Sequence, residues 1–106
     1  MQDYKKIAAR VFLSGYEHFR PADWEREFQS SRPLQVEIGF GQGEYLLSCV
    51  VNDPEKNHIG IELDWGRIQK CFKKASRLPE REQAFIQDHL RILQNDAWVV
   101  FERFFQ

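Results

Sequence analysis

Residues 33–47, PLQVEIGFGQGEYLL, contain the strongest structural pattern in this 106-residue chain. The aliphatic side chains within residues 34–38 predict a short buried strand. Gly39, Gly41 and Gly43 follow it at every second position, and residues without a Cβ allow a sharp turn and a close approach of the backbone to a ligand. A helix is expected directly after the last glycine. A strand joined to a helix by a glycine turn is typical of the nucleotide-cofactor site in doubly wound α/β folds.

The charges around this turn indicate which kind of cofactor it would bind. The dinucleotide fingerprint needs the spacing G-x-G-x-x-G, which the glycines here do not have. A helix N-terminus suits a phosphate, but Glu44 places a negative charge there, and Glu37 adds another before the turn. Both observations disfavour a nicotinamide dehydrogenase. Two carboxylates favour a cationic cofactor without phosphate, and S-adenosylmethionine, with its sulfonium and ammonium groups, fits that description.

The turn and its flanking segments resemble a known family. VEIGFGQGEYL at 36–46, DWEREF at 23–28 and IGIELDWGR at 59–67 are similar to the bacterial-type tRNA (guanine-N7)-methyltransferases. Three features together narrow the match to this family from methyltransferases in general: Phe40 between the first two glycines, the preceding Glu37-Ile38, and the upstream segment that contains Trp24. The resemblance extends from about residue 23 to the last residues. It implies a Rossmann-like fold that binds S-adenosylmethionine, and transfer of a methyl group to N7 of a guanine in tRNA.

Glu62 is the expected ribose-binding residue. It lies near the end of residues 58–63, HIGIEL, which predict a second strand, and it follows Gly43 by 19 residues. Nucleotide-binding folds place an acidic residue about 20 residues after the glycine turn, where it accepts hydrogen bonds from ribose hydroxyls. The alternative is a solvated glutamate at a strand end.

The third strand is predicted at 89–94, HLRILQ, and Asn95, Asp96 and Ala97 follow it. An aspartate at this strand end can accept a hydrogen bond from the adenine amine, while the backbone N–H of Ala97 can donate to a ring nitrogen. Alternatively, Asn95 or Asp96 caps a final helix at 97–105, and both roles can coexist.

The other segments predict helices around the sheet. A helix is expected at 3–14, a short one capped by Asp23, a third at 64–78, and a charged continuation at 80–88. The third helix has many cations opposite its apolar side, which are either simply solvated, the commoner case, or bind tRNA: Arg67, Lys70, Lys73, Lys74 and Arg77.

Composition excludes several classes of function. The formal net charge is −1, so any nucleic-acid binding must come from a local basic patch. No apolar run approaches the roughly 18 residues of a membrane span. Cys49 and Cys71 lack zinc or redox spacing, which indicates buried reduced thiols and a cytoplasmic location. No metal cluster or nucleophile–base pattern is present, so no catalytic residue is predicted.

The predicted fold class is α/β, a Rossmann-like doubly wound parallel sheet of the S-adenosylmethionine-dependent methyltransferase type, with strand order 3-2-1. Residues 1–33 are expected to form an N-terminal helical extension, and residues 34–106 the first, cofactor-binding half of the domain. The resembled family carries an Asp-Pro-Trp-type motif after a fourth strand, and this sequence has none. The chain is therefore expected to be truncated after about three strands and inactive alone, with tRNA as partner of the full-length protein. An open edge on the first strand would favour self-association.

Two other functions remain open: a methyltransferase acting on a small molecule or protein, and a non-catalytic nucleoside-binding or assembly subunit. The predicted cofactor-binding residues are Glu37, Gly39, Phe40, Gly41, Gly43, Glu62, Asn95, Asp96 and Ala97.

Overall fold

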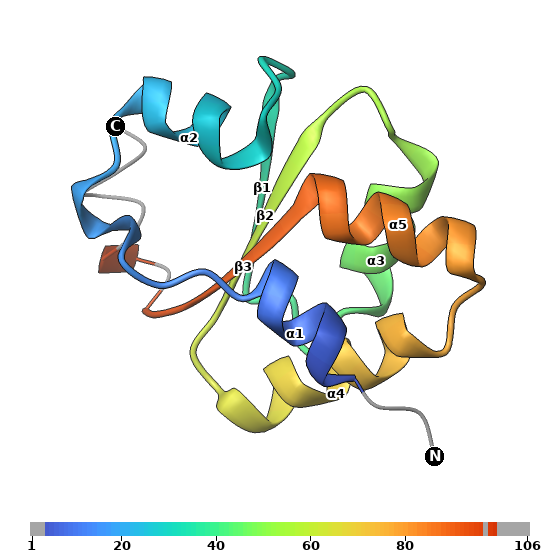
Figure 1. Cartoon of the computed structure of the whole chain (residues 1–106). Coiled ribbons are helices and arrows are strands. Elements are labelled where there is room, and N and C mark those ends of the chain that lie inside the picture. Colours follow the sequence, from blue (N-terminus) through green and yellow to red (C-terminus); the bar gives the residue numbers. More distant parts are fainter. Residues whose placement is uncertain (1–3, 97, 100–106) are drawn as a thin grey trace.

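The computed structural model describes residues 4–96, 98 and 99. The elements in chain order are α1 (Lys5–Val11), η1 (Tyr16–His18), α2 (Pro21–Phe28), β1 (Leu34–Ile38), α3 (Glu44–Asn52), β2 (Asn57–Glu62), α4 (Trp65–Ser76), α5 (Glu80–His89) and β3 (Leu90–Gln94) (Figure 1). Among these helices, none has the length and apolar character needed to cross a membrane.

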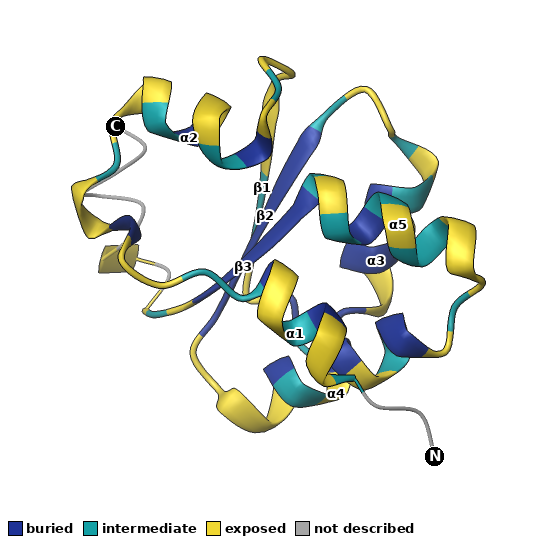
Figure 2. Ribbon diagram, in the orientation of Figure 1, coloured by how far each residue is buried: buried dark blue, intermediate teal, exposed yellow. Residues whose placement is uncertain are grey.

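The three strands form one parallel sheet in the order β1-β2-β3. In register, Val36 of β1 lies opposite Ile59 of β2, and Ile59 lies opposite Arg91 of β3. Every residue of the central strand β2 is buried (Figure 2). The α/β class, the parallel pairing and the expected 3-2-1 order are confirmed. The prediction that residues 34–38 form a buried strand is wrong: Leu34 and Ile38 are exposed, because no strand lies beside the outer side of β1 among the described residues.

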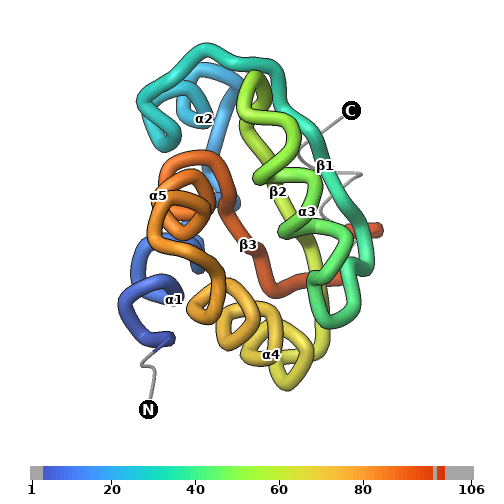
Figure 3. The backbone as a smooth tube through the Cα atoms, turned by 90° about the vertical axis from the view of Figure 1, so that its right-hand side faces the viewer, coloured from blue at the N-terminus to red at the C-terminus, as the bar shows by residue number. Residues whose placement is uncertain are grey.

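Helices cover both faces of this sheet. Apolar side chains of α1, α3, α4 and α5 pack with those of β3 in one core cluster, whereas η1 and α2 pack with β2 in a second. Figure 3 looks onto the face that carries α3, α4 and α5. The two clusters make a three-layer arrangement, as a doubly wound fold requires.

The N-terminal helices are part of this core. Ile7 and Val11 of α1 are buried in the first cluster, and Trp24 and Phe28 of α2 in the second. Between them, the chain pairs with β3, since the Leu13 N–H donates to the Ile92 carbonyl at 3.0 Å.

The helix ends show one error in the sequence interpretation. Asp64 caps α4 as predicted, accepting the Arg67 N–H at 2.9 Å. Asp23, in contrast, lies inside α2, where its carboxylate accepts the Arg20 N–H at 2.7 Å. The helix begins at Pro21 instead, because the fixed φ of proline suits the first helical position. The final helix predicted at 97–105 lies largely outside the described residues.

Candidate cofactor site

The carboxyl ends of the three strands meet at one edge of the sheet. The glycine turn at 39–43 follows β1, Glu62 ends β2, and Asn95 follows β3. Because the strands are parallel, these segments lie together at the lower left of Figure 1. Open α/β sheets bind their ligands outside the carboxyl ends of the strands.

The three predicted glycines are required by the backbone of the turn. Gly39, Gly41 and Gly43 have φ of 63°, 61° and 86°, a region that costs other residues roughly 1–2 kcal/mol. The Gly39 N–H donates to the Ile61 carbonyl at 2.8 Å, which holds the turn against β2. A Cβ built on Gly39 or Gly41 would meet no atom within 4 Å, so the turn faces open space. These positions can form a cradle for a ligand.

Phe40 has a different role from its neighbours in the turn. Its side chain is buried, and its ring lies 2.9 Å from where a Cβ on Gly60 of β2 would be. Leu46 of α3 lies 2.5 Å from the same Cβ position and belongs to the same core cluster as Phe40. The phenyl ring therefore anchors the turn in the core, and only the backbone of Phe40 is left to face a ligand.

Glu62 links the glycine turn to the loop after β2. It is only 6% exposed, its Oε1 accepts the Gly41 N–H at 3.0 Å, and its Oε2 accepts the Asp64 N–H at 3.0 Å. A solvated glutamate at a strand end, the alternative considered from sequence, does not describe this residue. Each carboxylate oxygen has two lone pairs, so both can accept a further hydrogen bond.

Glu37 lies on β1 next to the turn, half-buried and in register with Gly60. Tyr45, in the first turn of α3, is 68% exposed. A hydrogen bond with Cys49 raises the pKa of the Tyr45 phenol, and the charge of Glu37 raises it further. The structure thus presents an exposed aromatic ring at the start of α3. The helical pattern of the sequence could not show that Tyr45 points outward.

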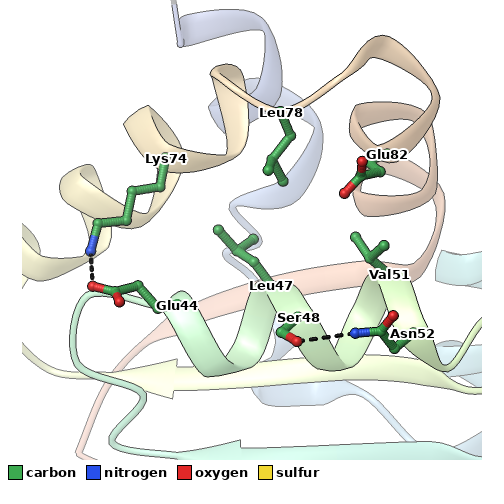
Figure 4. Close-up of a pocket in the computed structure, with 8 residues that line it drawn as sticks. All are labelled: Glu44, Leu47, Ser48, Val51, Asn52, Lys74, Leu78 and Glu82. Carbon is green, nitrogen blue, oxygen red and sulfur yellow. Dashed lines mark hydrogen bonds and ion pairs between the residues drawn. The ribbon is translucent and has the colours of Figure 1, made fainter.

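Glu44 forms an ion pair with a partner that the sequence interpretation did not include. The Lys74 ammonium of α4 donates to Glu44 Oε1 at 2.6 Å (Figure 4). It also donates to Gln42 Oε1 at 3.0 Å. The Lys74 hydrogen bond and charge lower the pKa of the Glu44 carboxyl. The argument that two carboxylates favour a cation therefore rests on Glu37 alone.

Glu44 also lines a pocket of about 360 Å³ between α3, α4 and α5. Its other lining residues are Leu47, Ser48, Val51, Asn52, Lys74, Leu78 and Glu82 (Figure 4). This pocket lies between helices and not in front of the strand ends, so it is separate from the candidate cofactor site.

Asn95 and Asp96 are held by hydrogen bonds at the end of β3. The Asn95 amide donates to the Tyr16 hydroxyl at 2.7 Å, which ties η1 to this edge. Burial raises the pKa of Tyr16, partly offset by this hydrogen bond. Asp96 Oδ1 accepts the Trp98 N–H at 2.9 Å, the capping role considered from sequence. Ala97 lies outside the described residues.

Tyr16 is the residue of this edge that sequence reasoning missed. It lies 79 positions before Asn95, and no local pattern connects them. In the part of the chain that the structure describes, no three His, Cys, Asp or Glu side chains gather to hold a metal ion.

Comparison with known sequences defines the class of protein. Residues 31–106 match the sequence model of the family described as "Putative methyltransferase". The match covers well over half of the chain, which therefore belongs to this methyltransferase family.

Its similar relatives are more specific, and they confirm the resemblance seen in the glycine turn. The chain is 38% identical over 80 residues to a tRNA (guanine-N(7)-)-methyltransferase of Vibrio vulnificus strain YJ016, an alignment covering 76% of the chain and 30% of the relative. A tRNA (guanine-N(7)-)-methyltransferase of Geobacter metallireducens is 30% identical over 91 residues, covering 86% of the chain and 43% of the relative. The chain thus spans less than half the length of these relatives.

One solved structure is also similar to the chain. It is the glycopeptide N-methyltransferase MtfA complexed with sinefungin, with 17% identity and a TM-score of 0.48. The similarity covers 87% of this chain and 39% of that one.

Proposed function

We propose that the chain forms the cofactor-binding part of a cytoplasmic S-adenosylmethionine-dependent methyltransferase that modifies N7 of a guanine in tRNA. Residues 34–106 would be the cofactor-binding half of the domain, and residues 1–33 its helical extension. The observation that carries the proposal is the position of Glu62, at the end of β2 and hydrogen-bonded to the glycine turn. The similarity to tRNA (guanine-N(7)-)-methyltransferases supports the substrate.

Each residue of the edge has a role in holding the cofactor. Glu62 accepts hydrogen bonds from the ribose hydroxyls while keeping its two bonds to backbone N–H groups. The turn at 39–43 lets the backbone approach the ligand, and Glu37 faces its positive groups. Asn95 keeps the loop after β3 in place, and Asp96 Oδ2 is left to accept from the adenine amine. The role of Ala97, a backbone N–H donor to a ring nitrogen, remains a prediction from the sequence.

Methyl transfer to guanine N7 needs little acid–base catalysis. When bound, S-adenosylmethionine supplies a methyl group on a sulfonium centre. Guanine N7 already carries a lone pair, so no base has to create the nucleophile. The residues of this chain contribute by orienting the methyl carbon for a near-attack geometry.

The ribose assignment can be tested by titration calorimetry with S-adenosylmethionine. Glu62→Gln should weaken binding by about 1–3 kcal/mol, the range for a hydrogen bond to a charged group. Glu55→Gln, an exposed glutamate between α3 and β2, is the matched control and should bind like the wild type. Thermal unfolding must accompany the titration, because Glu62 also holds two backbone N–H groups. Unchanged affinity in a folded Glu62→Gln variant would remove the assignment.

The same titration distinguishes cofactor classes. S-adenosylmethionine and S-adenosylhomocysteine should bind, whereas NAD should not, because the turn lacks the dinucleotide spacing and Glu37 lies beside it. Comparable affinity for NAD would contradict the proposal.

The substrate needs a protein of the relatives' length. We suggest replacing the aligned 80 residues of the Vibrio vulnificus relative by those of this chain. The chimera should form N7-methylguanosine in tRNA, detected by mass spectrometry of digested nucleosides. A chimera that binds the cofactor but methylates only a protein or small molecule, or nothing, would favour the other functions considered from sequence.

A further inference from the structure

Two adjacent helices of this nearly neutral chain carry no carboxylate. They are α1, with the sequence KKIAARV, and α4, with the sequence WGRIQKCFKKAS. Lys73 of α4 lies 5.6 Å above the Tyr4 ring at the start of α1, and Gln69 donates to the Tyr4 hydroxyl at 3.4 Å. The two helices lie side by side, with exposed residues along their outer sides (Figure 2). Positive charge is therefore concentrated on one surface.

The centre of this surface is a row of three cations on α4. Ile68, Cys71, Phe72 and Ala75 point into the core, and the opposite side of the helix presents Lys70, Lys73 and the directly following Arg77, all exposed. Steps of three and four residues advance about 5–6 Å along a helix and stay on one side of it. We call Lys70, Lys73 and Arg77 the α4 basic row.

The basic row is not used for ion pairs within the described structure. Lys70, Lys73 and Arg77 have no described carboxylate within ion-pair distance, although Lys73 contacts the Tyr4 ring. Five other cations do have a carboxylate partner: Arg10, Arg26, Lys56, Lys74 and Arg91. Favourable placement of cations at a helix C-terminus accounts for Lys73. It does not account for Lys70, one turn earlier, nor for the absence of acidic residues on the neighbouring helix.

We propose that the α4 basic row binds the phosphate backbone of the tRNA substrate, an inference that rests on the proposed function. The helix starts three residues after Glu62, and its Lys74 donates to Gln42 of the glycine turn, so the row lies on a helix that borders the candidate cofactor site. A guanine delivered to that edge brings neighbouring phosphates toward α4. Lysine and arginine contacts to phosphates position a nucleic acid without reading its sequence.

An anionic membrane is the other polyanion to consider. Helices that lie on membranes insert an apolar side into the lipid. The apolar side of α4 is already buried against the sheet, including the fully covered Ile68 and Cys71. The charge is available to a partner and the apolar side is not, which favours RNA.

The test is fluorescence anisotropy with an unmodified tRNA transcript at several salt concentrations. The triple variant Lys70→Gln, Lys73→Gln and Arg77→Gln should bind about tenfold or more weakly, and the slope of log K against log salt should fall by about 2–3. The control triple, Arg26→Gln, Lys56→Gln and Arg81→Gln, changes net charge equally and should retain affinity within about twofold, because these cations lie outside α1 and α4.

Several outcomes would overturn the proposal. These are wild-type affinity and slope in the row variant, equal losses in both triples, or no tRNA binding by the wild-type chain. Loss of binding to phosphatidylserine vesicles but not to tRNA would overturn it in favour of a membrane. If the triple variant of the row unfolds, the single variant Lys70→Glu replaces it, and its tRNA affinity and salt dependence are compared with those of the wild type and the control triple.

Titration of S-adenosylmethionine into the same variants separates this proposal from the proposed function. Row-dependent tRNA binding without any cofactor binding would support the basic surface and remove the proposed cofactor site. Normal cofactor binding with a tRNA affinity that does not depend on the row would support the cofactor site and remove the proposed tRNA-binding surface.

Discussion

Gly43 is constrained by both backbone conformation and packing. Its φ is 86°, and a Cβ at this position would lie 2.3 Å from the Cys71 sulfur of α4. Burial raises the pKa of the Cys71 thiol to about 12, so it packs there as a neutral group. The turn before α3 therefore also sets how closely α3 and α4 approach.

Gly43→Ala should lower the free energy of unfolding by the strain of a left-handed residue, roughly 1–2 kcal/mol, plus roughly 1–3 kcal/mol of overpacking. Gly15→Ala is the control, since Gly15 has φ of 77° but nothing within 4 Å of its Cβ position. Urea unfolding of both variants separates the two contributions. Equal losses in the two variants would show that the contact with Cys71 is relieved without cost.

At the level of elements, one buried ion pair fastens α2 to β3. Arg91 is 1% exposed, and its Nε donates to Glu27 Oε2 at 2.7 Å. Its Nη1 donates to the carbonyls of Gln87 and Leu90, and its guanidinium lies 5.2 Å from the Phe28 ring. The buried guanidinium is therefore compensated by one carboxylate, two backbone carbonyls and an aromatic ring.

Glu27→Gln should destabilise the chain by roughly 2–4 kcal/mol, because it leaves a buried guanidinium without its counter-charge. Glu25→Gln, on the same helix but exposed, should change stability little. Urea unfolding measures both. A loss in Glu27→Gln no greater than in Glu25→Gln would mean that the carbonyls alone satisfy Arg91.

His89, the last residue of α5, lies in a polar cluster at the amino ends of β2 and β3. Arg32 Nη1 is 2.8 Å from its Nε2, and Asn57 Oδ1 is 3.1 Å from its Nδ1. Arg32 Nη1 is also 3.2 Å from Nδ1, but a guanidinium can only donate and it lies closer to Nε2. A neutral ring then accepts at Nε2 and donates from Nδ1 to Asn57. Burial lowers the pKa of His89, and the charge of Arg32 lowers it further.

A histidine with a lowered pKa in the folded state makes stability depend on pH in one direction. The unfolded chain binds the proton more readily, so stability decreases as pH falls from about 7 through 6.5 toward the folded-state pKa. His89→Gln should therefore lose less stability than the wild type between pH 7.5 and 5.5, as measured by urea unfolding. His18→Gln, at an exposed histidine, should parallel the wild type. A His89→Gln curve parallel to that of the wild type would contradict the neutral state assigned to the ring.

At the scale of the whole molecule, the two outer strands of the sheet, β1 and β3, differ in whether their free side is paired. The outer edge of β3 is paired with the segment at Phe12 and Leu13. On its other side, β1 has no strand among the described residues, and Leu34 and Ile38 are 38% and 49% exposed. Unpaired edges with apolar side chains recruit other chains.

We expect the 106-residue chain to self-associate through this β1 edge, or to precipitate, at concentrations used for sedimentation. Ile38→Lys should shift sedimentation toward the monomer, since a charge on an edge strand opposes pairing. Leu63→Lys changes an equally apolar exposed residue outside the strands and should have a smaller effect. A well-dispersed wild-type monomer would refute the edge argument.

The features that the sequence alone determined are local ones. The alternation of residues 34–38, the glycines of the turn and the apolar run ending near Glu62 specify their elements through backbone conformations and periodicities within a few residues. The same holds for Asp64, which caps the helix that starts beside it. The family resemblance lies in these same segments, so the methyltransferase class was predictable.

Only the tertiary structure decided which side chains meet. Lys74 neutralises Glu44 from 30 positions away, Asn95 bonds to Tyr16 from 79, and Arg91 to Glu27 from 64. Periodicity predicts that a residue lies on one side of a helix but does not specify which distant element covers it. Pairing over such distances depends on how the layers pack, because only that packing brings these charges and amides together.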